Sequence, residues 1–303
     1  MDEQIGGFMA TEHKRNVVTE TMYRFVTCKF CGEHETIVKF GKTPAGRQRY
    51  LCQKCGRTFM DNQAPEGMQF PVPVMASAIN QFYEAVSLRK IARQIKMDYG
   101  VAPSHMNIYR WVVRYSQKAA KALADVPVRV GREWIADETV LKLKSRGGEN
   151  VWFWDAIDDK TKFLLASRLS ETRTTKDAQA LMERAEQRAG IVPKTIVTDK
   201  LRSYLDAVER TWGADTRHVK AGPFVRGKSE DSTRAIERFH GTLKDRTKVM
   251  RALGNKRSAG VIMDGWLVHY NFFRPHSGLG SKTPAEVAGA RTPFRSWKDV
   301  ILS

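Results

Sequence analysis

Residues 132–144 read Arg-Glu-Trp-Ile-Ala-Asp-Glu-Thr-Val-Leu-Lys-Leu-Lys, a mixture of apolar and polar positions that predicts a strand. Two further runs of mostly apolar residues follow at 150–157 and 162–167, separated by the turn-forming sequence Asp158-Asp159-Lys160. These segments predict three consecutive antiparallel strands. After them, the periodicity predicts a helix at 175–189, a short buried strand at 195–198, a helix at 201–212, a strand near 217–219 and a long helix at about 231–250.

The order of these elements is β-β-β-α-β-α-β-α. Three antiparallel strands continued by alternating helices and strands match a ribonuclease-H-like architecture. We therefore expect an α/β fold, with a ribonuclease-H-like mixed sheet and flanking helices. A basic, glycine-containing loop at 221–228 precedes the long helix. A further helix at about 259–273, with Trp266 and Tyr270, is expected to belong to the core, with a dimer contact as the alternative.

Three shorter helices are predicted before this α/β region, at 75–84, 88–97 and 105–115, with Ser87 and Ser104 as N-caps of the second and third. Together they indicate a helix-turn-helix, although an ordinary helical hairpin has the same pattern. Its small core would consist of Ile91, Ile95, Ile108 and Val112. A recognition helix presents its N-terminal end to the major groove, and the side chains expected on that exposed end are Ser104, His105, Asn107 and Arg110.

All four cysteines of the chain lie in one short segment, as Cys28, Cys31, Cys52 and Cys55. They form two C-x2-C pairs, each followed by glycine and 20 residues apart, which is a typical spacing for one tetrahedral zinc ion. Short strands predicted at 36–40 and 49–51 make the segment a zinc ribbon. A disulfide pair or a redox C-x-x-C are the alternatives. Four thiolates leave zinc no open position, so its role would be structural.

The charge of the chain favours a polyanionic partner. Lys and Arg number 51 against 33 Asp and Glu, a net charge of +18, and the excess is about +8 in residues 1–130 and +10 in 131–303. Because both halves are basic, nucleic acid is the first candidate. The composition, 42% hydrophobic and 28% charged, excludes wholesale disorder. No apolar run approaches the length of a membrane span, so we expect a cytoplasmic, nucleoid-associated protein that makes no membrane contact.

The length is that of about two domains with a small appendage. We expect a zinc ribbon at 1–60, a linker at 61–74, a helix-turn-helix DNA-binding domain at 75–122, a ribonuclease-H-like catalytic domain at 131–290 and a C-terminal tail at 291–303.

Three carboxylates stand out in the predicted catalytic domain: Asp137 on the first strand, Asp199 just after the short buried strand, and Glu237 on the late helix. Hard oxygen ligands suit Mg²⁺, and a pair of such ions supports phosphodiester chemistry. Spacing alone does not select these residues among the 33 acidic ones.

The residues that flank Asp137, Asp199 and Glu237 distinguish these three acids from the other acidic residues. The sequences are Trp134-x-x-Asp137-Glu-Thr139, Val197-Thr-Asp199-Lys-Leu-Arg-Ser-Tyr204 and Ile236-Glu237-Arg-Phe-His-Gly-Thr-Leu-Lys244-Asp-Arg246. They resemble the three acidic motifs of DDE transposases with an integrase-type catalytic core. The segments 270–279 and 282–286 are similar to the end of such domains, and Ser104-His-x-x-Ile-Tyr-Arg-Trp111 resembles the helix-turn-helix of the insertion-sequence-six group, some of whose members have an N-terminal zinc ribbon.

The resemblance implies an insertion-sequence transposase that cuts DNA at the ends of a mobile element and joins the freed 3′ hydroxyl to target DNA. Asp137, Asp199 and Glu237 would coordinate two Mg²⁺ or Mn²⁺ ions. Further cations expected to contact the DNA are Lys244, two helical turns beyond the glutamate, and Lys200 and Arg202 beside the second acid. Both element ends and target are double-stranded DNA, and joining two ends implies a homodimer or larger assembly.

The third metal ligand has an alternative, and the roles of two neighbouring residues need separate consideration. Glu230 lies between the second and third motifs and is an alternative third ligand, although the flanking motif favours Glu237. Glu138 is expected to face away from Asp137, because neighbours on a strand alternate sides, and has no catalytic role. His240, one turn beyond Glu237, either positions a phosphate or water or simply packs.

Two other functions remain open. A DNA-binding regulator derived from a transposase would use the ribbon and the helix-turn-helix without catalysis. A ribonuclease-H-like nuclease would cut DNA without joining it.

Overall fold

The computed structural model describes residues 26–44, 46–61, 64–65, 68–144, 150–220, 234–250 and 254–303. It divides into two compact units, Met1–Asp61 and Asn62–Ser303. The predicted basic loop at 221–228, the first residues of the predicted long helix and the competing acid Glu230 lie outside the described residues.

The first unit contains one small antiparallel sheet, with strand order β1-β2-β3. Strands β1 (Ile37–Lys42) and β2 (Gln48–Cys52) confirm the two predicted strands. Strand β3 (Thr58–Phe59) was not predicted, because two residues are too few to form a pattern. Its Phe59 packs with Cys28 and Cys52 in the small core of this unit.

The second unit begins with three helices, α1 (Val72–Tyr83), α2 (Leu88–Tyr99) and α3 (His105–Leu123). The predicted caps are confirmed: the Ser87 hydroxyl accepts from the backbone N–H of Lys90, and the Ser104 hydroxyl from that of Asn107. The four predicted core residues are fully buried (Ile91, Ile95, Ile108 and Val112). Helix α3 runs eight residues further than predicted, because its later turns also bury apolar side chains.

A five-stranded mixed sheet follows, with strand order β6-β5-β4-β7-β8. Its strands are β4 (Glu133–Lys142), β5 (Asn150–Asp158), β6 (Leu164–Ser170), β7 (Thr195–Thr198) and β8 (Arg217–Lys220). The first three are antiparallel neighbours, whereas β7 runs parallel to β4 and β8 parallel to β7. The predicted ribonuclease-H-like arrangement is confirmed.

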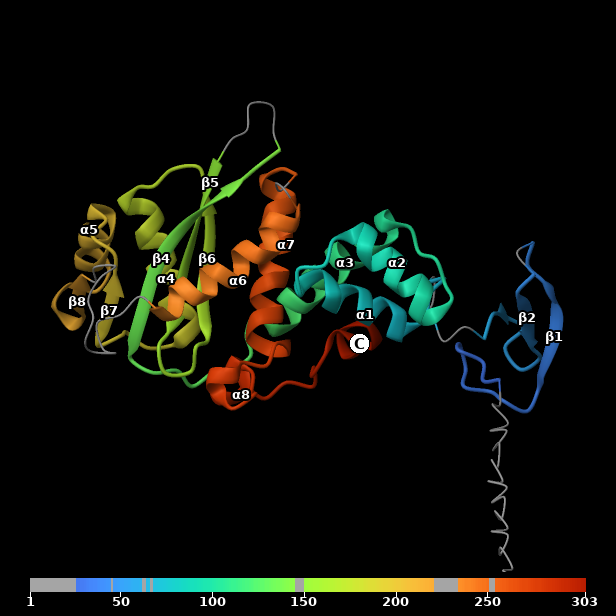
Figure 1. Ribbon diagram of the computed structural model, residues 1–303. Helices are drawn as coiled ribbons and strands as arrows, with labels where there is room; N and C mark the ends of the chain where they lie inside the picture. Colours follow the sequence, from blue (N-terminus) through green and yellow to red (C-terminus); the bar gives the residue numbers. More distant parts are fainter. Residues whose placement is uncertain are drawn as a thin grey trace, which may run out of the picture. The chain divides into compact units, whose positions relative to one another are not determined.

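Helices cover both faces of this sheet (Figure 1). Asp137 and Asp155 are paired across β4 and β5, so both side chains leave the same face, and helix α6 (Arg234–Met250) packs there through His240. The next pair in the register, Glu138 and Trp154, leaves the opposite face. That face carries helices α4 (Thr175–Ala189) and α5 (Arg202–Thr211). A single-turn 3₁₀ helix, Gly213–Asp215, connects α5 to β8.

The C-terminal segment returns to the three first helices. Helix α7 (Lys256–Val268) packs on α3 and continues as a single π-helical turn, His269–Phe273. After a 3₁₀ turn (Ser277–Leu279) and helix α8 (Pro284–Val287), helix α9 (Trp297–Leu302) packs against α1 and α3. Residues 291–303, expected as a tail, therefore complete the core, as do the buried Trp266 and Tyr270.

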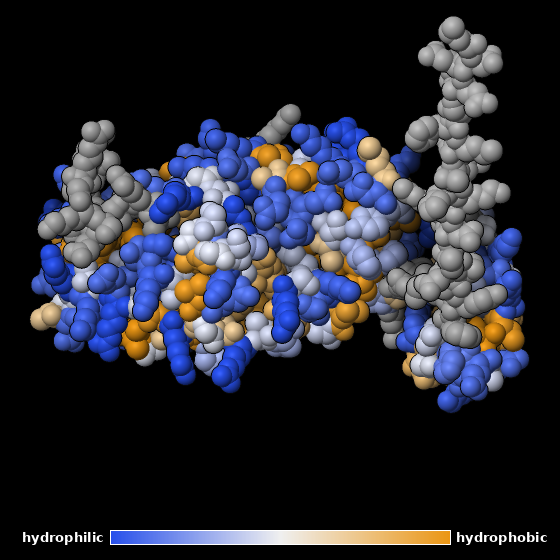
Figure 2. Space-filling model, turned by 60° about the horizontal axis from the view of Figure 1, so that its bottom comes forward, coloured by the Kyte–Doolittle hydropathy of each residue, from blue (hydrophilic) through white to orange (hydrophobic). Residues whose placement is uncertain are grey.

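No helix among the described residues combines the length and the apolar composition needed to cross a bilayer. Figure 2 shows a face of the molecule dominated by hydrophilic residues, with hydrophobic ones scattered among them.

Candidate active site and metal-binding residues

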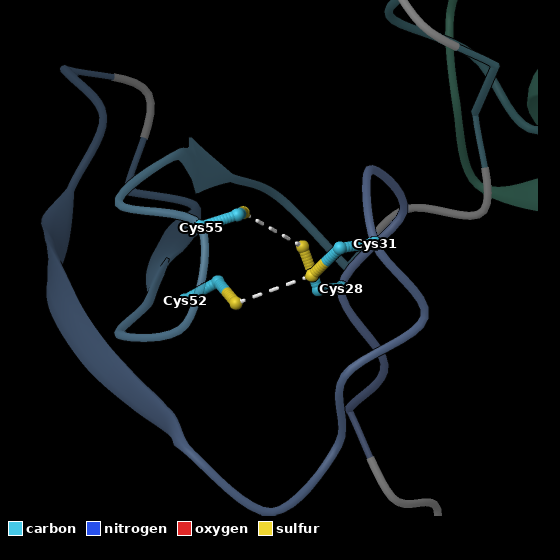
Figure 3. Close-up of side chains that lie close together, drawn as sticks. All are labelled: Cys28, Cys31, Cys52 and Cys55. Carbon is cyan, nitrogen blue, oxygen red and sulfur yellow. Dashed lines mark hydrogen bonds between the residues drawn. The ribbon is translucent and has the colours of Figure 1, made fainter.

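The four cysteine side chains converge from two loops of the first unit (Figure 3). The sulfur atoms of Cys28 and Cys55 lie 3.7 Å apart and those of Cys31 and Cys52 lie 3.6 Å apart, far beyond the length of a disulfide bond. Four sulfurs around a zinc ion at about 2.3 Å would be separated by about 3.8 Å. The donor set and its spacing therefore fit one tetrahedral zinc ion.

Each half of this cluster depends on the glycine that follows its cysteine pair. Gly32 and Gly56 have φ angles of +74° and +69°, in the left-handed region that glycine adopts without strain. Their N–H groups donate to the carbonyls of Cys28 and Cys52, closing the tight turn that aims two sulfurs at one point. The C-x2-C-G pattern is thus a geometric requirement of the cluster.

In the second unit, the fold brings Asp137 and Asp199 together. Asp137 lies on β4, and Asp199 directly follows β7, the parallel neighbour of β4. Their carboxylate oxygens lie within 4.8 Å of each other, and both residues are partly exposed. Asp199 Oδ1 accepts from the backbone N–H of Leu201 at 2.8 Å, which fixes this carboxylate at the start of α5.

A third carboxylate of the same cluster, Glu138, was not expected there. Its side chain leaves the opposite face of the sheet from Asp137, as strand alternation predicts. However, β7 pairs with β4 only as far as Ile135, so beyond that point Glu138 can reach around the end of β7 toward Asp199. The expectation that Glu138 faces away from Asp137 holds for the direction in which it leaves the strand but not for its carboxylate, which has an oxygen within 4.8 Å of those of Asp137 and Asp199.

Glu138 is held by Arg173, which lies just before α4. Arg173 Nε donates to Glu138 Oε1 at 2.7 Å, and a second guanidinium nitrogen contacts the same oxygen and lies 3.7 Å from Asp199 Oδ2. The guanidinium also stacks over the ring of Trp152, 4.6 Å from its centre. Burial raises the pKa of Glu138, and the hydroxyl of Tyr204 and the guanidinium only partly offset that rise.

On the other face, the imidazole of His240 lies between two aspartates. Its Nε2 is 2.9 Å from Asp155 Oδ2 and its Nδ1 is 3.4 Å from Asp137 Oδ2. Burial alone would lower the pKa of His240, but hydrogen bonds to the two carboxylates and their charges raise it to about 9. Burial raises the pKa of Asp155 to about 7, against the opposing effect of His240.

Glu237 lies one turn before His240 on α6 and is exposed. Its carboxylate is outside the group of described carboxylates within 4.8 Å, although its helix docks on the strand of Asp137. The cations predicted around the site, Lys200, Arg202 and Lys244, are all exposed.

At the start of α3, Ser104, His105 and Arg110 are exposed and Asn107 is partly buried. The hydroxyl of Ser104 is engaged in the cap. Met106, which was not singled out, is 47% exposed on the same turn.

Sequence reasoning missed Arg173, Asp155 and the carboxylate of Glu138, and left the role of His240 open. One signal was available for Asp155: a carboxylate in the otherwise apolar run Val151-Trp-Phe-Trp-Asp155-Ala-Ile157 needs a buried partner. No local signal marks Arg173, because its partner Glu138 is 35 residues away.

A family model described as a DDE domain matches residues 131–276. The uncharacterized 48.3 kDa protein of insertion element ISM1 from Methanobrevibacter smithii is 24% identical over 222 residues, which cover 67% of this chain and 53% of that protein. The chain thus spans about half the length of this relative.

Among solved structures, the HTLV-2 integrase catalytic core domain in complex with magnesium is 15% identical, with a TM-score of 0.39, and the match covers 54% of this chain and 99% of that one. The catalytic core domain of BIV integrase is 16% identical, with a TM-score of 0.38, covering 52% and 93% of the two chains. The family match itself includes Asp137 and Asp199 and the complete mixed sheet. Residues 131–276 of this chain are thus similar to a DDE domain.

Proposed function

We propose that this protein is an insertion-sequence transposase that cleaves DNA at element ends and transfers the freed strand to target DNA. The observation that carries the proposal is the convergence of the Asp137 and Asp199 carboxylates from two parallel strands, within the residues matched by the DDE domain model. Glu237, on the helix that docks beside Asp137, is the proposed third acid.

The donor set suits Mg²⁺ or Mn²⁺, because the oxygens of two carboxylates within 4.8 Å provide hard ligands and concentrated negative charge. When bound, such ions activate the attacking oxygen and stabilise the leaving oxygen of a phosphodiester. The proposed ligands are Asp137, Asp199 and Glu237. Because Asp199 accepts a hydrogen bond from the Leu201 N–H, its carboxylate needs little rearrangement to bind a metal ion.

In the first step, water attacks the phosphodiester at the element end, and the bond to the 3′ oxygen breaks to leave a 3′ hydroxyl. In the second step, that hydroxyl attacks a target phosphodiester, forming one bond as another breaks. No residue of the chain becomes covalently attached. The exposed Lys244, Lys200 and Arg202 bind the DNA phosphates and hold the scissile bond at the acids.

Two other parts of the chain complete the proposal. The four-cysteine cluster binds structural zinc, supported by its donor set and sulfur spacing. Helix α3 reads the element end through its exposed N-terminal turn, supported by the capped helix-turn-helix geometry and the net charge of +18. The reaction requires two DNA ends, so we expect a homodimer or larger assembly acting on double-stranded DNA at the nucleoid.

Incubation of the purified protein with end-labelled element DNA and Mg²⁺ tests the proposal, with products separated on a denaturing gel. Strand-transfer products longer than the labelled strand are expected. Cleavage without joining would instead establish the nuclease alternative, and DNA binding without either product would establish the regulator.

A further inference from the structure

The buried pair formed by Asp155 and His240 lies directly behind the candidate metal site. Asp155 is fully buried on β5, opposite Asp137 in the register of the sheet. His240, 5% exposed, comes from α6 and lies between the two carboxylates, 2.9 Å from Asp155 and 3.4 Å from Asp137. The imidazole therefore links the acid of β4 to a buried acid of the neighbouring strand.

The contacts leave the imidazole little freedom. Its Nε2 is fixed by Asp155, a side chain that cannot turn away because it is enclosed in the sheet–helix interface. Fixing one ring nitrogen sets the direction of the other, which meets Oδ2 of Asp137. Asp137 itself is partly exposed, so without this contact its carboxylate would be free to change rotamer.

Packing alone does not account for this pair. The other oxygen of Asp155, Oδ1, is buried and has no hydrogen-bond partner in the part of the chain that the structure describes. A buried carboxylate with incomplete partners costs stability, and apolar residues of similar volume would fill the same space at least as well. The pair is better explained by what it does to Asp137.

The same contact also sets the register of α6. His240 is three residues beyond Glu237, hence on a neighbouring position of the same helix face. Because the imidazole is anchored between β4 and β5, the position of α6 along the sheet and the rotation of α6 about its own axis are both fixed. The position of Glu237 is therefore fixed as well.

We propose that His240, held by Asp155, is a positioning residue that orients the Asp137 carboxylate and locks α6 so that Glu237 is presented to the same metal ions. This inference rests on the proposed function, because it takes Asp137 and Glu237 as metal ligands. It assigns no contact of His240 with DNA or with metal.

The test compares His240→Ala, His240→Asn and Asp155→Asn with the unchanged full chain. Electron paramagnetic resonance of Mn²⁺ in the absence of DNA measures the metal affinity directly. The dependence of end cleavage on Mg²⁺ concentration measures the metal affinity during the reaction. Outer-sphere partners of metal ligands typically contribute about 10–100-fold to affinity, and we expect His240→Ala to weaken Mn²⁺ binding by that factor. His240→Asn, whose amide nitrogen can take the place of Nδ1, should recover part of the loss.

Asp245→Ala is the matched control, because Asp245 is an exposed acid on the same helix, and it should bind Mn²⁺ as the unchanged chain does. Affinity for DNA without metal should be equal in all variants. Wild-type Mn²⁺ affinity in His240→Ala would overturn the positioning role, and so would an asparagine variant no better than alanine. If His240→Ala does not fold, wild-type affinity in both His240→Asn and Asp155→Asn overturns the role.

Asp137→Asn separates this inference from the proposed function. If Asp137→Asn loses Mn²⁺ binding while the His240 variants keep it, the positioning role alone fails. If Asp137→Asn binds Mn²⁺ normally, the assignment of the acids fails, and the proposed function with it.

Discussion

The hydroxyl groups of Tyr83 and Ser116 lie 2.6 Å apart and form a buried hydrogen bond between the end of α1 and the middle of α3. Gly265 of α7 lies against these two hydroxyl groups, and a Cβ atom added to Gly265 would collide with both of them. The absence of a side chain at this one position is what allows α7 to pack closely against the first helices.

Gly265→Ala should therefore destabilise the second unit, although alanine normally favours a helix. Forcing a methyl group into a filled site typically costs about 1–3 kcal/mol. Gly260→Ala is the matched control on the same helix, because a Cβ there meets nothing within 4 Å, and it should stabilise by about 0.5–1 kcal/mol. Urea unfolding followed by tryptophan fluorescence measures both. Equal midpoints for the two variants would contradict this account of the contact.

Local patterns predicted most of the elements, for identifiable reasons. The caps at Ser87 and Ser104 and the strand composition of the β4 segment are properties of a few adjacent residues, and the caps and the strand were confirmed. Contacts between distant segments were not predictable in this way. The pairing of Glu138 with Arg173 and of His240 with Asp155 joins residues 35 and 85 positions apart.

The candidate site shows the same division. Residue type and flanking motif pointed to Asp137 and Asp199, and the fold brings their oxygens within 4.8 Å. The inclusion of Glu138 depends on where β7 stops pairing with β4, which is set by the lengths of the two strands in space. Strand alternation correctly gave the face from which Glu138 leaves the sheet and could not give how far its carboxylate reaches.

Asp137→Asn and Asp199→Asn should each reduce end cleavage and strand transfer by at least about a hundredfold, because a neutral amide removes the charge that would hold a divalent ion. Affinity for element-end DNA should remain. Asp215→Asn, which neutralises an exposed acid away from the cluster, is the control and should retain normal activity. Gel analysis of labelled ends, with binding measured in parallel, checks this. Joining at a normal rate by either variant would remove that aspartate from the site.

Removal of zinc should unfold the first unit and leave the second folded. The binding free energy of a structural zinc site is also folding free energy, and the first unit has only a small core around Cys28, Cys52 and Phe59. All seven tryptophans lie in the second unit, so their fluorescence reports on that unit alone. Chelation should make residues 26–61 sensitive to protease without changing tryptophan emission. Continued protease resistance of the metal-free protein would show that zinc does not stabilise this unit.

The buried His269 should make the second unit sensitive to mild acid. It accepts from the indole N–H of Trp297 and lies 3.0 Å from Glu84, and both Trp297 and Tyr83 stack on its ring. Burial lowers its pKa below the ordinary value of 6.5, against the opposing effect of Glu84. The nearby Arg274 also disfavours protonation.

Below pH 6.5 the unfolded chain therefore binds a proton at this position that the folded chain does not, so the contribution of His269 to the free energy of unfolding should fall as the pH decreases through that range. The pKa values of His218 and His276 are lowered as well, so His269→Gln should remove part of the pH dependence. Urea midpoints between pH 5 and 8 measure it. An unchanged pH profile in His269→Gln would show that this histidine does not contribute.

Arg110→Ala should weaken binding to the element end more than a change elsewhere on the same helix. Arg110 is exposed on the N-terminal part of α3, where a recognition helix meets base edges, whereas Lys121 is exposed in its last turn. Loss of a bidentate base contact typically costs about 1–3 kcal/mol, and loss of a phosphate contact reduces the salt slope by about one. We therefore expect Arg110→Ala to reduce the preference for element-end over unrelated DNA, while Lys121→Ala leaves that preference unchanged. Fluorescence anisotropy at several salt concentrations separates the two effects. If both variants lose affinity equally for every sequence, Arg110 contributes charge but no sequence recognition.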